Sequence, residues 1–122
     1  MSIVDEIKRD LDAILGGDSK KLVETADKFG KHLKNKGLST SQIRAIFTRV
    51  QRLRRFDENT LNELNLLRPK MAYAVGRHKG KVKDLQDVLD EAIQKIDNET
   101  KFKNFKEFFE AILAYHRYHG GD

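Results

Sequence analysis

Residues 38–53 read LSTSQIRAIFTRVQRL, and this stretch shows the helical character of the chain most clearly. Ser39 is followed three residues later by Gln42, the spacing of a capping box, in which each side chain bonds the backbone N–H of the other residue. Beyond it, apolar residues recur three and four positions apart, as on one face of an amphipathic helix. They are Ile43, Ile46, Phe47, Val50 and Leu53. The pattern predicts a helix that begins after Ser39 and turns this face to the core.

The same spacing recurs along the rest of the 122-residue chain, with glycines at the interruptions. It predicts further helices over residues 3–15, from a cap at Asp18 or Ser19 to Gly37, over 60–66, over 69–77, over 82–96, and from about Asn104 to Gly120. Pro69 is expected in the first turn of a restarted helix, because proline has no backbone N–H and restricts the residue before it. We therefore expect an all-α protein, a compact bundle of five to six helices that forms a single helical domain over residues 1–122.

Composition excludes several kinds of site and location. The chain has no cysteine, so it has no disulfide and no thiolate nucleophile. No apolar run approaches the ~20 residues that a membrane-spanning helix requires. The N-terminal decapeptide, MSIVDEIKRD, carries acidic residues and lacks the apolar stretch of a secretory signal. We expect a cytoplasmic protein with no membrane partner.

Charge is distributed in blocks along the sequence. Between Lys28 and Lys83 there are fifteen Lys or Arg residues and three acidic residues, a local net charge of +12. The two flanks carry a net charge of −7, so that the whole chain has a net charge of +5. A basic middle between acidic ends indicates an electropositive surface that binds a polyanion, for which nucleic acid is the leading candidate. The alternative is a set of solvated basic helix faces.

Two groups of basic residues make up this middle region. The helix after Ser39 has arginines on its polar side, and no acidic residue occurs between Thr40 and Phe56 to pair with them. These are Arg44, Arg49, Arg52 and Arg55. The second group comprises Arg68, Lys70, Arg77, His78, Lys79, Lys81 and Lys83. Tyr73, within it, is compatible with stacking on a base, although a core position beside Ala72 and Val75 is the favoured interpretation.

Catalytic and metal-binding patterns are weak. His116 and His119 have an i,i+3 spacing, but no third ligand stands at a recognised distance, and structural roles are favoured. Four acidic residues near one helix are compatible with Mg²⁺ but are more typical of a solvated face. They are Asp84, Asp87, Asp90 and Glu91. No phosphate loop, nucleophile elbow or dinucleotide motif is present, which favours a protein that is not an enzyme and has no cofactor.

Three segments together resemble a known family. They are LSTSQIRAIFTRVQRL at residues 38–53, LNLLRPKMAYAVGRHKG at 64–80 and FKNFKEFFEAILAYHRYHGG at 102–121. In this order they resemble the small helical subunit of type III-A CRISPR (Csm) effector complexes, with LLRPKMAYAVGR as the most specific piece. The resemblance covers roughly residues 38–122.

The resemblance implies a non-catalytic subunit of an antiviral, RNA-guided complex, in which several copies stack head to tail. It implies CRISPR RNA, target RNA, other Csm subunits and further copies of the chain as partners. Because base pairing with the guide reads the sequence, the protein need recognise only backbone and shape. The residues expected to contact RNA phosphates are Arg44, Arg52, Arg55, Lys70, Arg77, Lys79, Lys81 and Arg68. Arg68 has an alternative role, an ion pair with Asp57 or Glu63 that holds the fold.

Two other functions fit the residues. The first is a helix-turn-helix-like DNA-binding module in which residues 38–56 form the recognition part, although Gln51 and Thr48 are its only obvious base-reading side chains. The second is a structural protein–protein adaptor, in which the basic middle meets an acidic partner or the acidic flanks of another copy.

Overall fold

The computed structural model describes residues 2–77 and 80–122, and every regular element in these two ranges is an α-helix. The helices are α1 (Ile3–Leu15), α2 (Ser19–Asn35), α3 (Thr40–Gln51), α4 (Glu58–Arg77), α5 (Lys83–Lys95) and α6 (Glu99–Tyr118). The predicted all-α bundle is confirmed. None of the helices in the described ranges combines the length and the apolar character needed to cross a bilayer.

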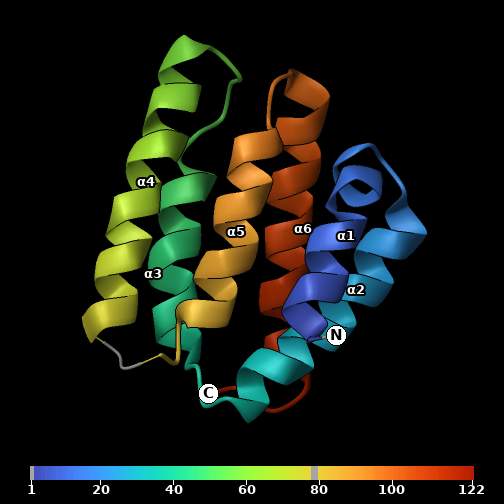
Figure 1. Ribbon diagram of the computed structural model, residues 1–122, viewed down its shortest axis with the longest axis vertical. Helices are drawn as coiled ribbons and strands as arrows, with labels where there is room; N and C mark the ends of the chain where they lie inside the picture. The colour runs from blue at the N-terminus through green and yellow to red at the C-terminus, as the bar shows by residue number, and fades with distance from the viewer. Residues whose placement is uncertain (1, 78–79) are drawn as a thin grey trace.

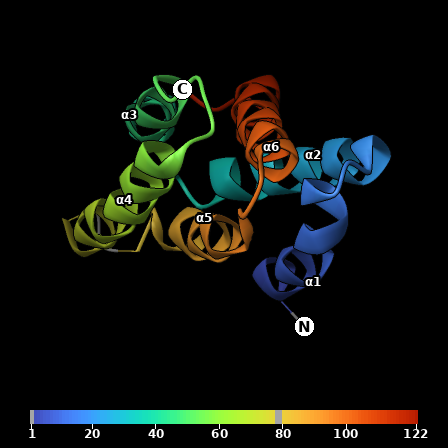
Figure 2. The ribbon, with the colours of Figure 1, turned by 90° about the horizontal axis from the view of Figure 1, so that it is seen from above.

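The helices form two layers (Figures 1 and 2). Seen from above in Figure 2, α3, α6 and α2 lie in one layer, and α4, α5 and α1 lie in the other. Helix α6 packs on α2 and α3 within its layer, and α5 packs on α4 and α1 within the second. The core lies between the layers and is rich in phenylalanine from α6, including Phe105, Phe108 and Phe109, all fully buried.

The most extensive contact in the bundle is between α2 and α6. Gly30 of α2 makes it possible, because the two backbones meet there. A Cβ added to Gly30 would lie 2.6 Å from the backbone nitrogen of His116 on α6. Phe29, next to Gly30, is completely buried in the same region. A glycine in the middle of α2, which the sequence pattern alone does not explain, is therefore a packing requirement.

Helix starts follow the capping chemistry of the sequence, with one error of prediction. The capping box at α3 is confirmed, since Ser39 accepts from the Gln42 backbone N–H and the Gln42 side chain accepts from that of Ser39. The last helix, expected to start near Asn104, begins at Glu99. Asn98 is its N-cap, and its side-chain oxygen accepts from the Lys101 backbone N–H at 2.8 Å.

The predicted break at Pro69 is also wrong, because α4 runs without interruption from Glu58 to Arg77 with Pro69 inside it. Pro69 lies on the exposed side of the helix, where the carbonyl it leaves without a donor can meet water. The opposite side, with Leu64, Leu67 and Met71, is buried. Tertiary packing on this side outweighs the local cost of proline.

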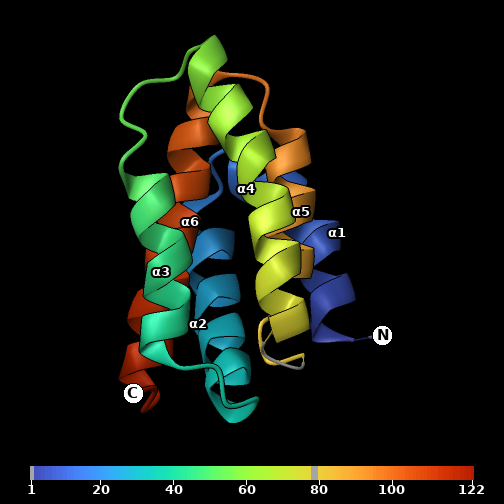
Figure 3. The same cartoon turned by 90° about the vertical axis from the view of Figure 1, so that its left-hand side faces the viewer.

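Helices α3 and α4 form one edge of the molecule. Figure 3 looks at this edge and shows them side by side, connected by residues 52–57 at one end. Their main packing partners are different helices, α6 for α3 and α5 for α4. The two helices therefore meet across the boundary between the layers without a close contact along their length.

Replacing Gly30 and Gly76, the glycines inside α2 and α4, with alanine should change the free energy of unfolding in opposite directions. Gly30→Ala should lower the free energy of unfolding by about 1–3 kcal/mol or more, because its methyl group would overlap the α6 backbone. Gly76 lies in α4, and a Cβ there would have no atom within 4 Å. Gly76→Ala should raise the free energy of unfolding by about 0.5–1 kcal/mol, because alanine restricts the unfolded chain.

Urea unfolding of both variants and the parent chain measures this difference. Equal responses of the two variants would contradict the close crossing of α2 and α6.

Candidate nucleic-acid interface

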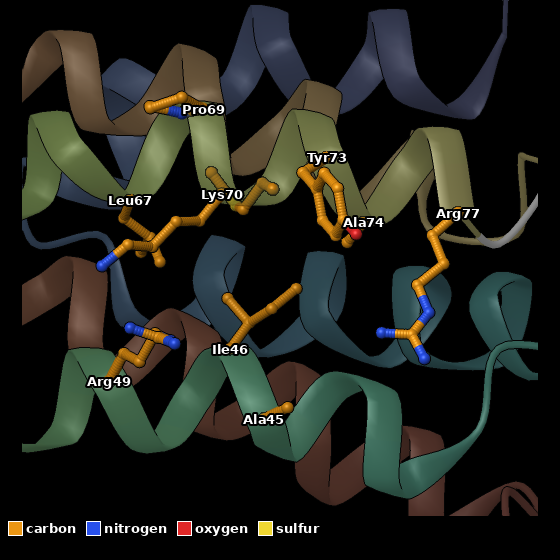
Figure 4. A pocket seen from close by; sticks show the side chains of 10 residues that line it. Ala45, Ile46, Arg49, Leu67, Pro69, Lys70, Tyr73, Ala74 and Arg77 are labelled. Carbon is orange, nitrogen blue, oxygen red and sulfur yellow. The ribbon is translucent and has the colours of Figure 1, made fainter.

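A groove of about 490 Å³ lies between α3 and α4. Its apolar lining comes from both helices and includes Ala45, Ile46, Leu67, Pro69, Met71 and Ala74. Three cationic side chains and a tyrosine complete the lining: Arg49, Lys70, Arg77 and Tyr73. Figure 4 shows Arg49 and Lys70 at one end of the groove and Arg77 at the other. The groove combines an apolar floor with positive charge at both ends.

Within residues 2–77 and 80–122, none of these three cations forms an ion pair with a carboxylate. Arg49, Lys70 and Arg77 are all exposed. Glu63 lines a narrower cavity together with Arg49 and Lys70, but it pairs with neither. The structure thus brings together two predicted site residues, Lys70 and Arg77, with their charges available to an anion.

Sequence reasoning counted Arg49 among the arginines on the polar side of its helix but left it out of the expected RNA contacts. The helical pattern of residues 38–53 already places Arg49 on the polar side of α3, about 140° from Arg44. The sequence pattern does not show where α4 lies. In the structure α4 lies opposite the side of α3 that carries Arg49, so this side forms a wall of the groove.

Tyr73 corrects an expectation from the sequence. We favoured a core position for it, but its side chain is 73% exposed. Figure 4 shows its ring extending from α4 at the mouth of the groove. Leu67 and Met71 are the residues of α4 that enter the core instead. Tyr73 is therefore an aromatic surface open to solvent, flanked by Lys70 and Arg77 on the same helix.

Arg52 and Arg55 lie beyond the end of α3 rather than on its polar face. Helix α3 ends at Gln51, Arg52 is its C-cap, and Arg55 belongs to the connection to α4. Contacts with the bundle hold this connection in place. The Leu53 carbonyl accepts from Lys106 Nζ at 2.8 Å, and the Arg55 carbonyl accepts from the Thr60 hydroxyl. Both arginines are exposed.

Asp57 is the last residue of this connection, directly before α4 begins at Glu58. Its carboxylate accepts from the Thr60 backbone N–H at 2.9 Å. This bond, with smaller contributions from the Thr60 hydroxyl and the charge of Arg55, holds the pKa of Asp57 below its usual range. An ionised cap is favoured at a helix N-terminus, where the backbone N–H groups are positive.

The remaining predicted phosphate contacts do not all lie at the groove. Arg44 faces a separate polar pocket of about 520 Å³, lined also by Arg117, Asp122 and the hydroxyl residues 39–41. Lys81 lies beside Gly37, with its Cε 3.9 Å from the position of a Cβ on that glycine. Lys79, together with His78, lies outside the described residues. Of the predicted contacts, Lys70 and Arg77 therefore line the groove, whereas Arg44 and Lys81 do not.

Arg68 forms a structural ion pair, as the alternative prediction had it, but its partner differs from the expected one. Its Nε donates to Asp90 on α5 at 2.7 Å, whereas we expected Asp57 or Glu63. The two side chains are 36% and 26% exposed, so the pair is partly shielded from water. Arg68 links α4 to α5 and points away from the groove lining, and its expected contact with RNA phosphates is not supported by its position.

Protein partners are found for both histidines of the i,i+3 pair and for three of the four acidic residues singled out in the sequence. His116 is fully buried with Nε2 2.6 Å from the Leu38 carbonyl oxygen, and His119 lies 2.5 Å from Asp27. Asp84 contacts His32 at 2.6 Å, and Asp87 pairs with Lys83. No group of three His, Asp or Glu side chains within the described part of the chain is placed to hold a metal ion.

The fold and the groove define a small, basic helical-bundle protein with a group of unpaired cations at the groove between α3 and α4. The family model described as Csm2 Type III-A matches residues 17–122. A curated protein of Streptococcus thermophilus named "CRISPR system Cms protein Csm2" is 35% identical over 98 residues, which cover 71% of this chain and 79% of that protein. No solved structure gives a significant match.

This chain therefore belongs to the Csm2 family of small subunits of the type III-A CRISPR effector complex. Small subunits of this family are generally structural. Membership of a Csm complex implies the other Csm subunits and CRISPR RNA as partners. The resemblance noted in the sequence is confirmed.

The ion pair of Arg68 makes a prediction that separates structure from RNA contact. Arg68→Gln should lower the free energy of unfolding by up to about 1 kcal/mol, a value limited by partial exposure. It should leave the salt dependence of RNA binding unchanged. Lys70→Gln is the matched control, and should change the stability by less than about 0.5 kcal/mol because Lys70 has no carboxylate partner among the described residues. A weaker salt dependence in Arg68→Gln would show that this side chain contacts phosphate after all.

The lowered pKa of Asp57 predicts a pH-dependent stability. A depressed carboxyl pKa stabilises the folded state fully above its ordinary value of about 3.9, and this stabilisation is lost as the pH falls through the lowered pKa. Thermal unfolding of the parent chain and of Asp57→Asn should therefore differ most near neutral pH, with the parent more stable. The difference should vanish in acid. A difference that is constant between about pH 7 and pH 3 would exclude a role for the charge.

Proposed function

We propose that this chain is the non-catalytic small subunit that binds the RNA backbone along the guide–target groove of its complex, without sequence specificity, in antiviral defence. The proposal assigns no chemical step to the chain. Its partners are CRISPR RNA and target RNA, the other Csm subunits and further copies of the chain. The observation that carries it is the set of unpaired cations at the α3–α4 edge.

The cations at this edge come from two neighbouring helices and the connection between them, and they have no carboxylate partners among the described residues. Lys70 and Arg77 face Arg49 across the groove, and Arg52 and Arg55 follow beyond the end of α3. Side chains so placed repel one another in the free protein, and a polyanion relieves this repulsion. Helix α4, with 20 residues, is about 30 Å long, so the edge is long enough to follow several nucleotides.

The side chains at this edge favour backbone contacts over base reading. Arginine and lysine neutralise phosphates without selecting bases. Asn, Gln and Asp side chains, which read base edges, are absent from the lining of the groove. A protein of this kind suits a complex in which base pairing with a guide supplies the specificity.

The two alternative functions receive less support from the packing. A helix-turn-helix unit needs its recognition helix braced by the helix before it. Here α3 packs mainly on α6, while α2 is engaged by α6 and α1. The adaptor hypothesis and RNA binding both involve the same basic surface, and the experiment below distinguishes between these two functions.

Neutralising two groove cations should weaken RNA binding. For Lys70→Gln/Arg77→Gln we expect about tenfold weaker binding of labelled single-stranded RNA, measured by fluorescence anisotropy over a salt series. The salt slope should fall by about 1.4, because two phosphate contacts are lost at about 0.7 each on a single strand. Two unrelated RNA sequences should give the same values.

The control is Lys8→Gln/Lys20→Gln, which removes the same charge from α1 and α2, on the far side of the bundle from α3 and α4. It should leave both affinity and slope nearly unchanged. Preference for one DNA duplex over RNA would favour the DNA-binding module. Unchanged RNA binding by the groove variant, together with lost self-association in sedimentation, would favour the adaptor.

A further inference from the structure

The backbone contacts of the proposed function leave two features of the groove unexplained. The first is Tyr73, a residue that is 73% exposed and lies at the mouth of the groove. The second is the apolar floor, whose accessible part comes from Ala45, Pro69 and the half-buried Ala74 and which phosphates cannot use. Burying an aromatic ring is favourable, so an exposed one beside a cavity and positive charge indicates a surface that a ligand covers.

The groove has the chemistry of a nucleotide site. Its apolar floor and the face of Tyr73 suit a flat nucleobase, and stacking on an aromatic side chain is a common mode of single-strand binding. Arg49 and Lys70 at one end and Arg77 at the other can take the phosphates on either side of that base. No residue of the lining carries a carboxylate. The volume of about 490 Å³ lies within the usual range for small-ligand sites.

We propose that the α3–α4 groove holds an unpaired RNA nucleobase stacked on Tyr73, with the flanking phosphates on the cations at its two ends. This inference rests on the proposed function and adds to it a second type of contact, with a base rather than with the backbone. Stacking does not depend on which base is present, because every base has a π-face. The contact therefore requires an unpaired nucleotide but no particular sequence.

Charge complementarity favours RNA over a protein segment as the occupant. An amphipathic helix would need apolar anchors repeated along a long groove, whereas here cations limit the apolar floor at both ends. A nucleotide carries its apolar surface between two negative charges, in the same order as the apolar floor and the cations of the groove. The exposed ring of Tyr73 at the mouth adds the stacking surface.

The test uses the full chain and single-stranded RNA that contains one 2-aminopurine, a base whose fluorescence is quenched by stacking. Wild type should quench it and bind with a defined salt slope. Tyr73→Ala should lose the quenching and bind about fivefold to 150-fold more weakly, the usual effect of removing one stacking partner. Its salt slope should stay the same, because no phosphate contact is removed. Tyr73→Phe should restore both quenching and affinity.

Tyr118→Ala is the matched control, since Tyr118 is 78% exposed at the end of α6, away from the groove lining. It should behave as wild type. A duplex RNA of the same sequence should bind equally to wild type and Tyr73→Ala, because it offers no unpaired base.

The outcomes separate this inference from the proposed function. Equal RNA affinity of wild type and Tyr73→Ala, with the salt slope intact, would overturn base stacking and leave backbone binding in place. Absence of RNA binding by the wild-type chain even at low salt would overturn both. Loss of self-association in Tyr73→Ala with unchanged RNA binding would assign the groove to a second copy of the chain instead.

Discussion

The close crossing of α2 and α6 is the contact on which the arrangement of the other helices depends. Gly30 lets the α6 backbone approach within a distance that no side chain could tolerate. With α6 fixed there, its phenylalanines face several helices at once, and Phe109 meets Phe47 of α3 with ring centroids 5.2 Å apart. Helix α5 in turn holds α4, partly through the pair between Arg68 and Asp90. Because α3 packs on α6 and α4 packs on α5, the position of each helix does not depend on contact with the other.

This independence allows the groove to remain open. Closing it would bury more of the apolar surface of Ala45, Pro69 and Ala74, which line the groove and are not buried. It would also bring Arg49 of α3 against Lys70 of α4. Two like charges 4 Å apart cost about 1–4 kcal/mol, between the dielectric of water and that typical of a protein surface. This repulsion is comparable to the gain from burying one side chain, so the folded protein keeps an apolar floor exposed between charged walls.

The sequence predicts what local chemistry determines and misses what distant segments determine. The capping box of α3 and the helical period that follows it are local, and both predictions were confirmed. The partner of Arg68 lies 22 residues away on α5, which no spacing rule specifies. The continuity of α4 through Pro69 depends on packing against α5, and the exposure of Tyr73 depends on α4 using Leu67 and Met71 for that packing. The membership of Arg49 in the site follows from the same placement.

The position of α4 also has a consequence for binding. Helix α4 packs mainly on one neighbour, α5, so it has fewer contacts than α6 to hold it in the bundle. On the proposed function, an RNA strand in the groove touches α3 and α4 at the same time and neutralises the charges that keep them apart. A ligand that binds only the assembled edge stabilises that edge by mass action. RNA binding in the groove should therefore stabilise the packing of α4 against the bundle, without any change of fold.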